Sequence, residues 1–400
     1  MLDQHVLVLN CGSSSLKFAI LEAQTGDEII TGLAECLISE DARLKYVYQG
    51  QKYTEALTAH ASHQQAIARL VEIITINKLE KSLIAVGHRV VHGGEHFTQS
   101  VIITEQVKQV IAETTSLAPL HNPANLVGIE AAEKAFDSLP QIAVFDTAFH
   151  QTMPKHAYLY ALPYELYQQH GVRRYGFHGT SHHYVAKQAA SLLDQPFETL
   201  ALISAHLGNG CSVTAIKHGV SVDTSMGLTP LEGVVMGTRS GDIDPGLFNF
   251  LTQQLGYSAV KIDTLLNKQS GLLGLSELSN DCRTIEDAHL AGNAQASLAL
   301  EVFCYRLAKQ IAAYVVPLGK LDGLIFTGGI GENSQLIREK VIHSLSFFGF
   351  QLNEQANSQA RFGQSGIITS NQTGPQALVI PTNEEWMIAR DAATLAQEAN

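Results

Sequence analysis

The chain has 400 residues, 45% of them hydrophobic, a composition typical of globular proteins with two or more domains. Its formal net charge of −12 argues against a nucleic-acid partner, since a phosphate backbone requires a basic surface. No apolar run approaches the ~20 residues that span a bilayer, so we expect no membrane partner. The start, MLDQHVLVLN, lacks the features of a secretory signal, and the five scattered cysteines suit a reducing cytoplasm.

The first part of the chain predicts strands followed by alternating helices and strands. Four short apolar runs between residues 5 and 48 predict successive strands, and helical periodicity begins near His63. The elements predicted next are a strand, two helices and a strand, at 83–92, 105–116, 124–136 and 141–149. This order is typical of a mixed α/β domain.

The same pattern then starts again. The segments VLVLNCGSSSLKFAI (6–20) and LISAHLGNGCSVTAI (202–216) share one plan, in which two apolar strands flank a bend rich in Asn, Gly and Ser. A helix precedes the second copy, and helices fill 246–318. A strand, GLIFTGG, then leads to a helix from about Ser334.

We therefore predict two similar α/β halves, at 1–149 and 150–383. A final helix at about 384–400 is expected to pack back on the first half. No Pro/Ser-rich linker separates the halves, which favours two lobes that touch and hinge. The predicted fold class is a duplicated α/β architecture with the active site in a cleft between the domains.

Three glycine-rich bends indicate anion binding. Two are the bends of the duplicated hairpins, and the third, FTGGIGENS, leaves a strand and opens a helix. Glycine lets backbone N–H groups point at an anion. The third bend is neither a GxGxxG fingerprint nor a P-loop. An ordinary turn explains any single bend equally well, but three together point to a polyphosphate held between two halves.

Charged residues beside these bends are candidates for chemistry. Arg89 and Arg239 lie next to glycines with little other charge nearby, a setting typical of carboxylate or phosphate clamps. Asp146 ends a strand and Glu384 begins a helix, where carboxylates can hold Mg²⁺, although Glu384 could instead stabilise its own helix dipole. The histidine spacings do not fit a zinc site. A lone histidine such as His178, just before a predicted helix, is more often structural.

Nine segments, in order, resemble the acetate kinase (acetokinase) family of the sugar kinase–Hsp70–actin superfamily. They are NCGSSSLK, HRVVHGGE, LHNPANL, VFDTAFH, YGFHGTSHHYV, HLGNGCS, GLTPLEGVVMGTRSGDIDPG, GGIGENS and IPTNEE. The resemblance implies duplicated actin-like (ribonuclease H-like) domains. It also implies reversible, Mg²⁺-dependent transfer of the ATP γ-phosphoryl group to acetate, giving acetyl phosphate and ADP. Mn²⁺ is expected to substitute for Mg²⁺, and the family forms homodimers.

The resemblance also assigns site residues by motif. The catalytic residues are Asp146, His178 and Arg239. The substrate-binding residues are Arg89, Val91, Leu120, His121, Phe177 and Pro230. The ATP-binding residues are Ser13, Ser15, Lys17, His206, Leu207, Gly208, Asn209, Gly210, Asp281, Cys282, Arg283, Gly329, Ile330, Gly331, Glu332 and Asn333. The metal-site residues are Asn10 and Glu384.

Two alternatives remain open at this level. A kinase for propionate or another short-chain acid shares the same motifs, and the similar propionate kinases tend to carry Ala where this chain has Val91. An actin-like or Hsp70-like ATPase module would keep the hairpins but would not need the paired arginines. Residues 27–80 and 350–376 carry no usable motif.

Overall fold

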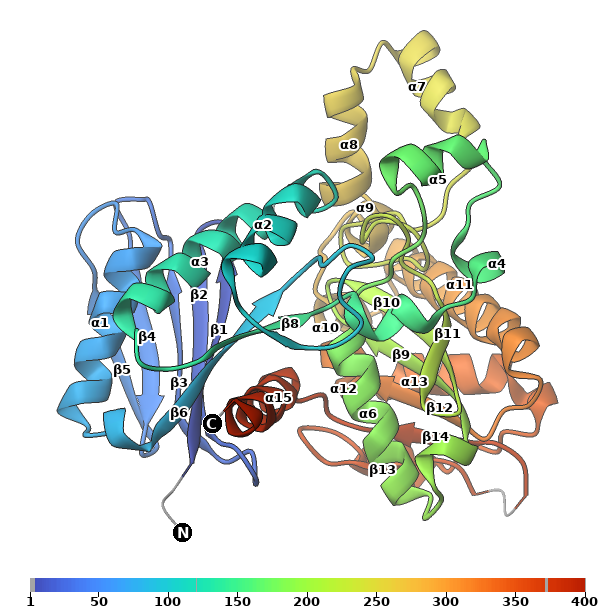
Figure 1. Cartoon of the computed structure of the whole chain (residues 1–400). Helices are drawn as coiled ribbons and strands as arrows, with labels where there is room; N and C mark the ends of the chain where they lie inside the picture. The colour runs from blue at the N-terminus through green and yellow to red at the C-terminus, as the bar shows by residue number, and fades with distance from the viewer. Residues whose placement is uncertain (1–3, 120, 371–372, 400) are drawn as a thin grey trace. The chain divides into compact units, whose positions relative to one another are not determined.

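The computed structural model describes residues 4–119, 121–370 and 373–399 (Figure 1). It forms two compact units, and each is described by itself. The first unit comprises Met1–Gln151 and Asn383–Asn400, and the second comprises Thr152–Thr382. Among the described residues, no helix combines the length and apolarity needed to cross a membrane.

The first unit is built on an eight-stranded mixed sheet in the order β5-β4-β3-β2-β1-β6-β8-β7. Its strands are β1 (His5–Gly12), β2 (Ser15–Glu22), β3 (Glu28–Glu35), β4 (Arg43–Tyr48), β5 (Gln51–Ala56), β6 (Leu83–Val90), β7 (Val101–Ile102) and β8 (Gln141–Phe145). Strands β1 to β5 are antiparallel neighbours, whereas β1, β6 and β8 are parallel.

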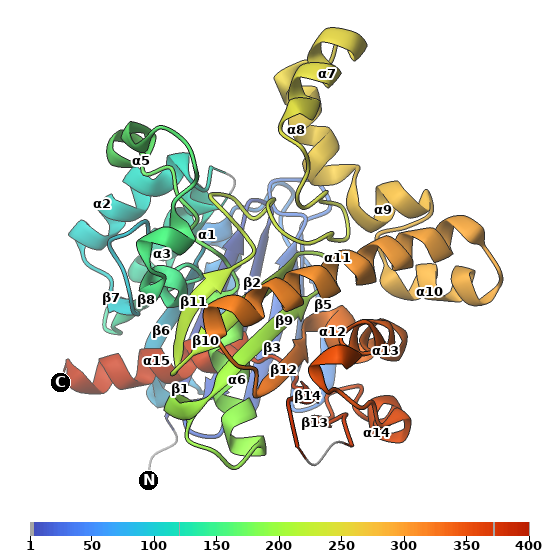
Figure 2. The ribbon, with the colours of Figure 1, turned by 90° about the vertical axis from the view of Figure 1, so that its right-hand side faces the viewer.

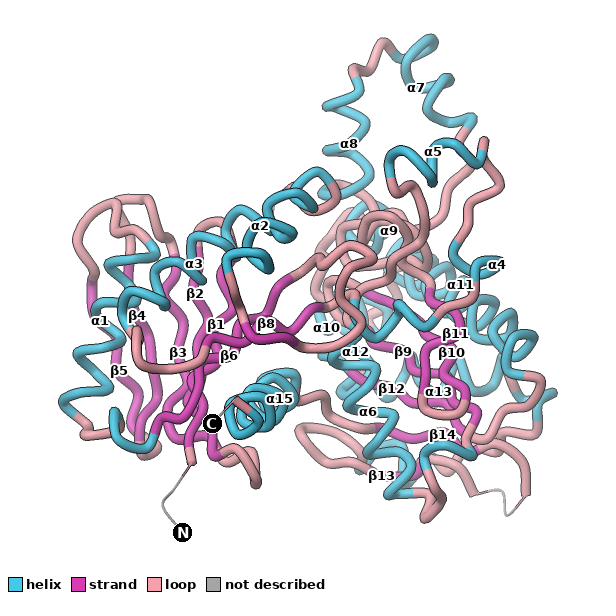
Figure 3. Tube along the Cα trace, viewed as in Figure 1, coloured by secondary structure: helices cyan, strands magenta, loops and turns pink. Residues whose placement is uncertain are grey.

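Helices cover both faces of this sheet. They are α1 (His63–Ile76), α2 (Glu105–Glu113), α3 (Asn122–Ala135) and α15 (Glu384–Glu398), with 3₁₀ turns η1 (Glu80–Ser82), η2 (Thr114–Ser116) and η3 (Ala148–Thr152). Alternate residues of β1 face opposite sides. Leu7 and Leu9 join a core with α1 and α3, whereas Val6 and Val8 join a core with Ile388 of α15. Helices α1 and α3 lie on one face of the sheet and α15 lies on the other (Figure 3).

The second unit contains a six-stranded sheet in the order β11-β10-β9-β12-β14-β13. Its strands are β9 (Ala201–Leu207), β10 (Cys211–Lys217), β11 (Val220–Thr224), β12 (Gly323–Thr327), β13 (Gly366–Ile367) and β14 (Gln376–Val379). Strands β9, β12 and β14 are parallel, and β9, β10 and β11 are antiparallel. The order β3-β2-β1-β6-β8 of the first unit is therefore repeated, which confirms the predicted duplication.

Helices surround the second sheet. They are α4 (Lys155–Tyr158), α5 (Tyr164–His170), α6 (Gly179–Leu192), α7 (Gly246–Leu255), α8 (Ala259–Lys268), α9 (Gly271–Ser276), α10 (Cys282–Leu290), α11 (Ala294–Leu318), α12 (Gly328–Asn333), α13 (Gln335–Ser344) and α14 (Glu354–Gln359), with η4 (Phe197–Thr199) and η5 (Ser346–Phe348). Helix α11 packs on β9, β10 and β11, while α7 and α8 project from the rest of this unit (Figure 2).

One helix begins earlier than the sequence predicted. The glycine-rich segment after β12 is itself the short helix α12, followed at once by α13, whereas we expected a helix only from about Ser334. The fully buried Arg338 explains this start, because its Nη1 donates to the carbonyl oxygens of Gly331 and Glu332 at 2.9 and 2.8 Å. At the other end, Glu332 Oε1 accepts a 2.9 Å hydrogen bond from the N–H of Gly328.

Candidate functional site

A cluster of one arginine and two carboxylates lies in the first unit. Strands β6 and β8 run parallel and side by side, which brings Arg89 next to the residue after β8, Asp146. Arg89 donates two hydrogen bonds to Asp146, from Nε to Oδ1 at 3.0 Å and from Nη2 to Oδ2 at 2.6 Å. Glu384, the first residue of α15, places its Oε2 3.7 Å from Arg89 Nε. Three predicted site residues therefore converge here.

The charges in this cluster shift one another's pKa values. Burial raises the pKa of both Asp146 and Glu384, and Arg89 opposes the increase. Burial alone would lower the pKa of Arg89, but the charges of Asp146 and Glu384 raise it above its usual value. With one cation against two carboxyl groups, the ionised cluster has an excess of negative charge.

The first hairpin bend lies between β1 and β2. Asn10 pairs with Lys17 in the strand register, and Lys17 Nζ forms an ion pair with Glu385 Oε1. Ser13 lies in the exposed turn and Ser15 begins β2. No hydrogen bond joins Asn10 to Glu384 within the described part of the chain.

A metal at this edge of the first unit would depend on few protein ligands. No group of three or more His, Cys, Asp or Glu side chains that could hold a metal occurs among the described residues. Mg²⁺ usually keeps several waters and takes one or two carboxylates plus substrate phosphates. The carboxylate of Glu384, which belongs to the negatively charged cluster, and the amide oxygen of Asn10 are oxygen donors of the kind that Mg²⁺ prefers.

Of the predicted substrate-pocket residues that follow Arg89 in the first unit, the structure describes Val91 and His121. Val91 follows β6, is 7% exposed, and its N–H donates to Asn125 Oδ1 at 3.1 Å. His121 lies at the N-cap of α3, close enough to Asp146 for its charge to act on that carboxyl. Leu120 lies outside the described residues.

In the second unit, His178 and Arg239 converge on the bend between β9 and β10. A Cβ atom added at Gly210 would lie 3.2 Å from Arg239 Nη1 and 3.4 Å from His178 Cε1. Glycine therefore lets both side chains approach the backbone closely. His178 adopts the left-handed conformation (φ 56°) before α6, and its ring stacks on His206 with a centroid separation of 4.3 Å.

A buried polar network orients His178. Its Nδ1 lies 2.9 Å from Ser212 Oγ, which lies 2.7 Å from Nε2 of His182. His182 Nδ1 in turn lies 3.0 Å from Ser204 Oγ. These contacts engage the Nδ1 side of the His178 ring and fix its rotation. The sequence motifs point to His178 but not to Ser212, His182 and Ser204, which support it.

Arg239 has a different environment from Arg89. Its Nη1 donates to the Pro230 carbonyl oxygen at 3.1 Å, and no carboxylate lies within ion-pair distance of it in the described part of the chain. Burial lowers the pKa of Arg239. Phe177, beside His178, is 3% exposed. The side of this unit that carries His178 and Arg239 therefore has an uncompensated positive charge.

The loop that carries Pro230 and Arg239 is held by residues that sequence analysis missed. Glu232 accepts a hydrogen bond from the Tyr160 hydroxyl and a 2.5 Å hydrogen bond from Arg174 Nη2. Arg174 also donates to the Ser225 carbonyl oxygen at 3.1 Å. No local sequence pattern predicts that these three side chains meet, because they come from separate loops.

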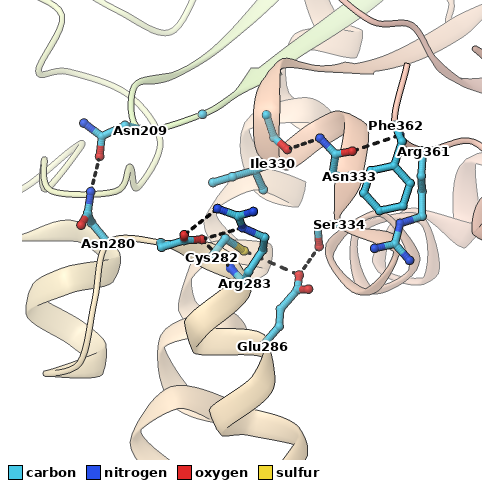
Figure 4. Close-up of a pocket in the computed structure, with 13 residues that line it drawn as sticks. Asn209, Asn280, Cys282, Arg283, Glu286, Ile330, Asn333, Ser334, Arg361 and Phe362 are labelled. Atoms are coloured by element: carbon cyan, nitrogen blue, oxygen red, sulfur yellow. Dashed lines mark hydrogen bonds and ion pairs between the residues drawn. The ribbon is translucent and has the colours of Figure 1, made fainter. Parts of the chain in front are cut away.

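A cavity of about 730 Å³ lies in the second unit (Figure 4). Eight predicted ATP-binding residues line it: Gly208, Asn209, Asp281, Cys282, Arg283, Gly329, Ile330 and Asn333. The remaining lining residues were not predicted: Asn280, Glu286, Ser334, Arg361 and Phe362. Asn280 adjoins a predicted segment and Glu286 follows one on α10, whereas Arg361 and Phe362 fall in a stretch without a motif.

Five predicted ATP-binding residues of the second unit do not line this cavity. Gly210 and His206 instead contact the His178 side, as described above. Leu207 is fully buried, and a Cβ atom added at Gly328 would lie 2.8 Å from the carbonyl oxygen of Leu207. Gly331 is buried, and Glu332 caps the Gly328 amide. These positions support the cavity wall rather than form its surface.

The cavity wall contains a network of hydrogen bonds. Asn280 Nδ2 donates to Asn209 Oδ1 at 3.0 Å, and Arg283 Nη2 donates to Asp281 Oδ2 at 2.9 Å. Glu286 Oε1 accepts from the Ser334 hydroxyl (Figure 4). The arrangement offers polar side chains along a groove that starts beside the positive His178–Arg239 region.

Comparison with known proteins agrees with this picture. The family model described as the acetokinase family matches residues 5–390. An acetate kinase of Shewanella baltica is 60% identical over 397 residues, covering 99% of each chain. The solved acetate kinase of Porphyromonas gingivalis is 45% identical, with a TM-score of 0.94, over 98% of this chain and 99% of that one. The solved propionate kinase of Francisella tularensis is 46% identical, with a TM-score of 0.92, over 98% of this chain and 100% of that one. The chain therefore belongs to the acetokinase family.

Proposed function

We propose that this chain transfers the γ-phosphoryl group of Mg²⁺-bound ATP reversibly to acetate, giving acetyl phosphate and ADP. As a member of the acetokinase family, it is a kinase that phosphorylates a carboxylate. The observation that carries acetate as the acceptor is the full-length, 60% identity to a curated acetate kinase. The positive His178–Arg239 region beside the cavity supports the phosphoryl-transfer role.

In the proposed mechanism the second unit binds the nucleotide. The cavity lined by Asn209, Asp281 and Arg283 holds ATP, with the γ-phosphoryl group toward Gly210. Phosphoryl transfer spreads charge over three oxygens, so catalysis is mostly positioning and electrostatic stabilisation. Among the described residues no carboxylate pairs with Arg239, so its guanidinium is available to donate to these oxygens. His178, fixed through Ser212, supplies a second donor.

The first unit is proposed to bind acetate and metal. Arg89 holds the acetate carboxylate. Asp146 orients the Arg89 guanidinium through the two hydrogen bonds between these side chains. Asn10 and Glu384 would hold Mg²⁺, and we expect Mn²⁺ to substitute. When bound, the ion neutralises charge on the phosphate oxygens. Lys17, Ser13 and Ser15 would contact the nucleotide from the first hairpin.

Acetate is an anion and already a competent nucleophile. No strong general base is needed to activate it, so we propose direct in-line transfer without a phosphoenzyme. Asp146 fits an orienting role better than a base role, because its carboxylate is already engaged by Arg89.

The test is a hydroxamate assay with ATP, Mg²⁺ and a series of short carboxylates. The proposal expects acetyl hydroxamate in an amount that depends on both acetate and Mg²⁺, with propionate and butyrate poorer. If as much hydroxamate forms after a chelator has removed divalent metal as with added Mg²⁺, the proposed Mg²⁺ site is wrong. A clear preference for propionate would favour the second candidate, a propionate kinase, which the similarity to the Francisella tularensis protein supports.

We further propose that the chain is a cytoplasmic homodimer. The five cysteines, which are all free thiols in the structure, support a reducing compartment. Helix α7 supports self-association, because none of its residues is buried and Phe248 and Phe250 are both 51% exposed. Light scattering after size exclusion tests this: the wild type should have twice the mass of one chain. A Phe248→Asp, Phe250→Asp variant should shift toward the monomer, and a monomeric wild type would contradict the proposal.

A further inference from the structure

The segment that leads to His178 and the segment that leads to Pro230 are hydrogen-bonded to each other in the second unit. The carbonyl oxygen of Gly227 accepts hydrogen bonds from the N–H groups of residues 175–176, at 3.0 and 3.3 Å. The Pro230 carbonyl oxygen in turn accepts a hydrogen bond from Arg239. The placement of His178 relative to Arg239 therefore depends on how firmly these two segments are held together.

A buried ion pair fastens the same two segments through side chains. Arg174 belongs to the first segment and Glu232 to the second, and Arg174 Nη2 donates to Glu232 Oε1 at 2.5 Å. Arg174 Nη1 also donates to the carbonyl oxygens of Thr224 and Ser225, at the end of β11. The two charged side chains are only 19% and 29% exposed. A partly buried ion pair that is bonded at several points holds its geometry better than an exposed pair.

Tyr160 joins this ion pair from a third loop. Its hydroxyl donates to Glu232 Oε2 and accepts a 2.9 Å hydrogen bond from the N–H of Leu228. The arrangement requires glycine at position 227, because a Cβ atom there would lie 1.7 Å from Glu232 Oε2 and 2.2 Å from the Tyr160 hydroxyl oxygen. Both carboxylate oxygens of Glu232 are thus engaged, one by a cation and one by a hydroxyl. These three side chains form the Arg174–Glu232–Tyr160 clamp.

We propose that this clamp positions the two phosphoryl-transfer donors, His178 and Arg239, relative to each other. The inference rests on the proposed role of those donors and adds three positioning residues to it. Arg174 fixes the segment that leads to His178, and Glu232 fixes the loop on which Pro230 accepts from Arg239. Donors stabilise a transition state only when they are preorganised, so a small change in their spacing lowers kcat while the nucleotide cavity still binds its ligand.

Steady-state kinetics in the hydroxamate assay, together with titration calorimetry of ADP with Mg²⁺, test the proposal. Glu232→Gln should lower kcat by roughly 10–100-fold, the size that a misplacement of about 1 Å causes. KM for ATP and the affinity for ADP should stay close to the wild-type values. Tyr160→Phe removes one hydroxyl from the clamp and should lower kcat less than Glu232→Gln does.

Lys320→Met is the matched control. It breaks another ion pair of the same unit, in which Lys320 Nζ lies 2.8 Å from Asp322 Oδ2, just before β12. We expect its kcat to equal that of the wild type. A kcat lowered as much as in Glu232→Gln would mean that any lost ion pair in this unit has the same effect, and the proposal would be wrong.

A double-mutant cycle with Arg239 separates positioning from general damage. Arg239→Met removes one donor and should leave a measurable kcat, roughly 10²–10³-fold below the wild type. Glu232→Gln should then lower kcat much less in that variant than in the wild type, because the group it positions is already absent. The full effect of Glu232→Gln in the Arg239→Met background would overturn the proposal.

Two other outcomes would also overturn it: an unchanged kcat in Glu232→Gln, or a loss of ADP affinity as large as the loss of kcat. Every comparison is made with the wild type under the same conditions. A failure of the proposed acetate kinase activity would therefore appear in the wild type itself, whereas a failure of the clamp would appear only in the variants.

Discussion

The arginines of the two units are set in opposite electrostatic surroundings. Arg89 of the first unit is hydrogen-bonded to Asp146 and lies near Glu384, so two carboxylates face its single positive charge. Arg239 of the second unit contacts a carbonyl oxygen and a sulfur atom, and no carboxylate pairs with it in the described residues. The two units nevertheless share one strand order around the same kind of glycine-rich hairpin.

This difference shows that the duplicated fold fixes positions and not chemistry. A site with negative excess favours a metal ion and holds an arginine rigidly for one carboxylate. A site with positive excess favours phosphate oxygens, whose charge grows or spreads during transfer. Division of labour between similar halves therefore depends on a few side chains at the strand ends.

The largest effect is expected in the second unit, from His178→Ala. Removing one preorganised donor to the transition state typically lowers kcat by ~10²–10³-fold. KM for ATP should change far less, since the cavity residues remain. His343→Ala, an exposed histidine on α13 of the same unit, is the control. A nearly normal kcat in His178→Ala would mean that the histidine has a structural role only.

Arg89→Lys is expected to act on substrate binding in the first unit. A lysine cannot reproduce the planar fork, and the loss of a charge-assisted hydrogen bond should raise KM for acetate by roughly 10–100-fold. KM for ATP should rise much less. Arg239→Lys should instead lower kcat, so steady-state kinetics of the two variants side by side sharpen the contrast. Equal effects of Arg89→Lys on both substrates would count against its assignment.

Val91→Ala should alter the choice between acetate and propionate. A branched side chain is expected to leave room for one methyl group, and one methylene in such a pocket is worth roughly 10–200-fold in kcat/KM. The variant should lower the ratio of kcat/KM for acetate to kcat/KM for propionate, mainly by raising kcat/KM for propionate. Val86→Ala, a buried valine of β6, controls for general loosening of the core. An unchanged ratio would refute a role of Val91 in the pocket.

The smallest effect concerns acid stability of the first unit. Burial lowers the pKa of His88, whose Nε2 lies 2.8 Å from Gln141 Oε1, to about 4. His88 therefore takes up a proton at a higher pH in the unfolded chain than in the folded chain. The free energy of unfolding consequently falls as pH drops from about 6.5 toward 4. We expect a loss of about 1 kcal/mol between pH 6.5 and 5.5.

The chain offers a convenient probe for this measurement. Its single tryptophan, Trp386, lies in the first unit, so urea unfolding followed by tryptophan fluorescence reports on that unit. His88→Gln keeps a hydrogen-bonding side chain without the titration and should show a smaller decrease over the same range. Parallel pH profiles for the wild type and the variant would contradict the assignment to His88.

The sequence predicted the duplication well, because each hairpin is a local pattern of apolar runs around Gly, Asn and Ser. It also singled out Arg89, Asp146 and Glu384, which the structure brings together, although their roles stay predictions. The helical start at Gly328 was missed, since glycine has low helix propensity and the stabilising Arg338 lies ten residues farther on.

Other features of the site depend on contacts that no local pattern encodes. Tyr160, Arg174 and Glu232 meet only because three separate loops fold together. Phe362 gave no signal either, because a single aromatic residue in an irregular segment has no periodicity, and its left-handed backbone is visible only in three dimensions.

The return of α15 to the first unit has a consequence for synthesis on the ribosome. Residues of this helix, including Ile388 and Ala392, cover the face of the sheet that Val6 and Val8 form, and they are translated after all of the second unit. The nascent first unit must therefore keep that apolar face uncovered while the second unit emerges and can already fold. This reverses the usual order in which N-terminal domains finish first. Because Glu384 begins the same helix, the covering of that face and the arrival of the last charged group of the Arg89 cluster happen in a single step.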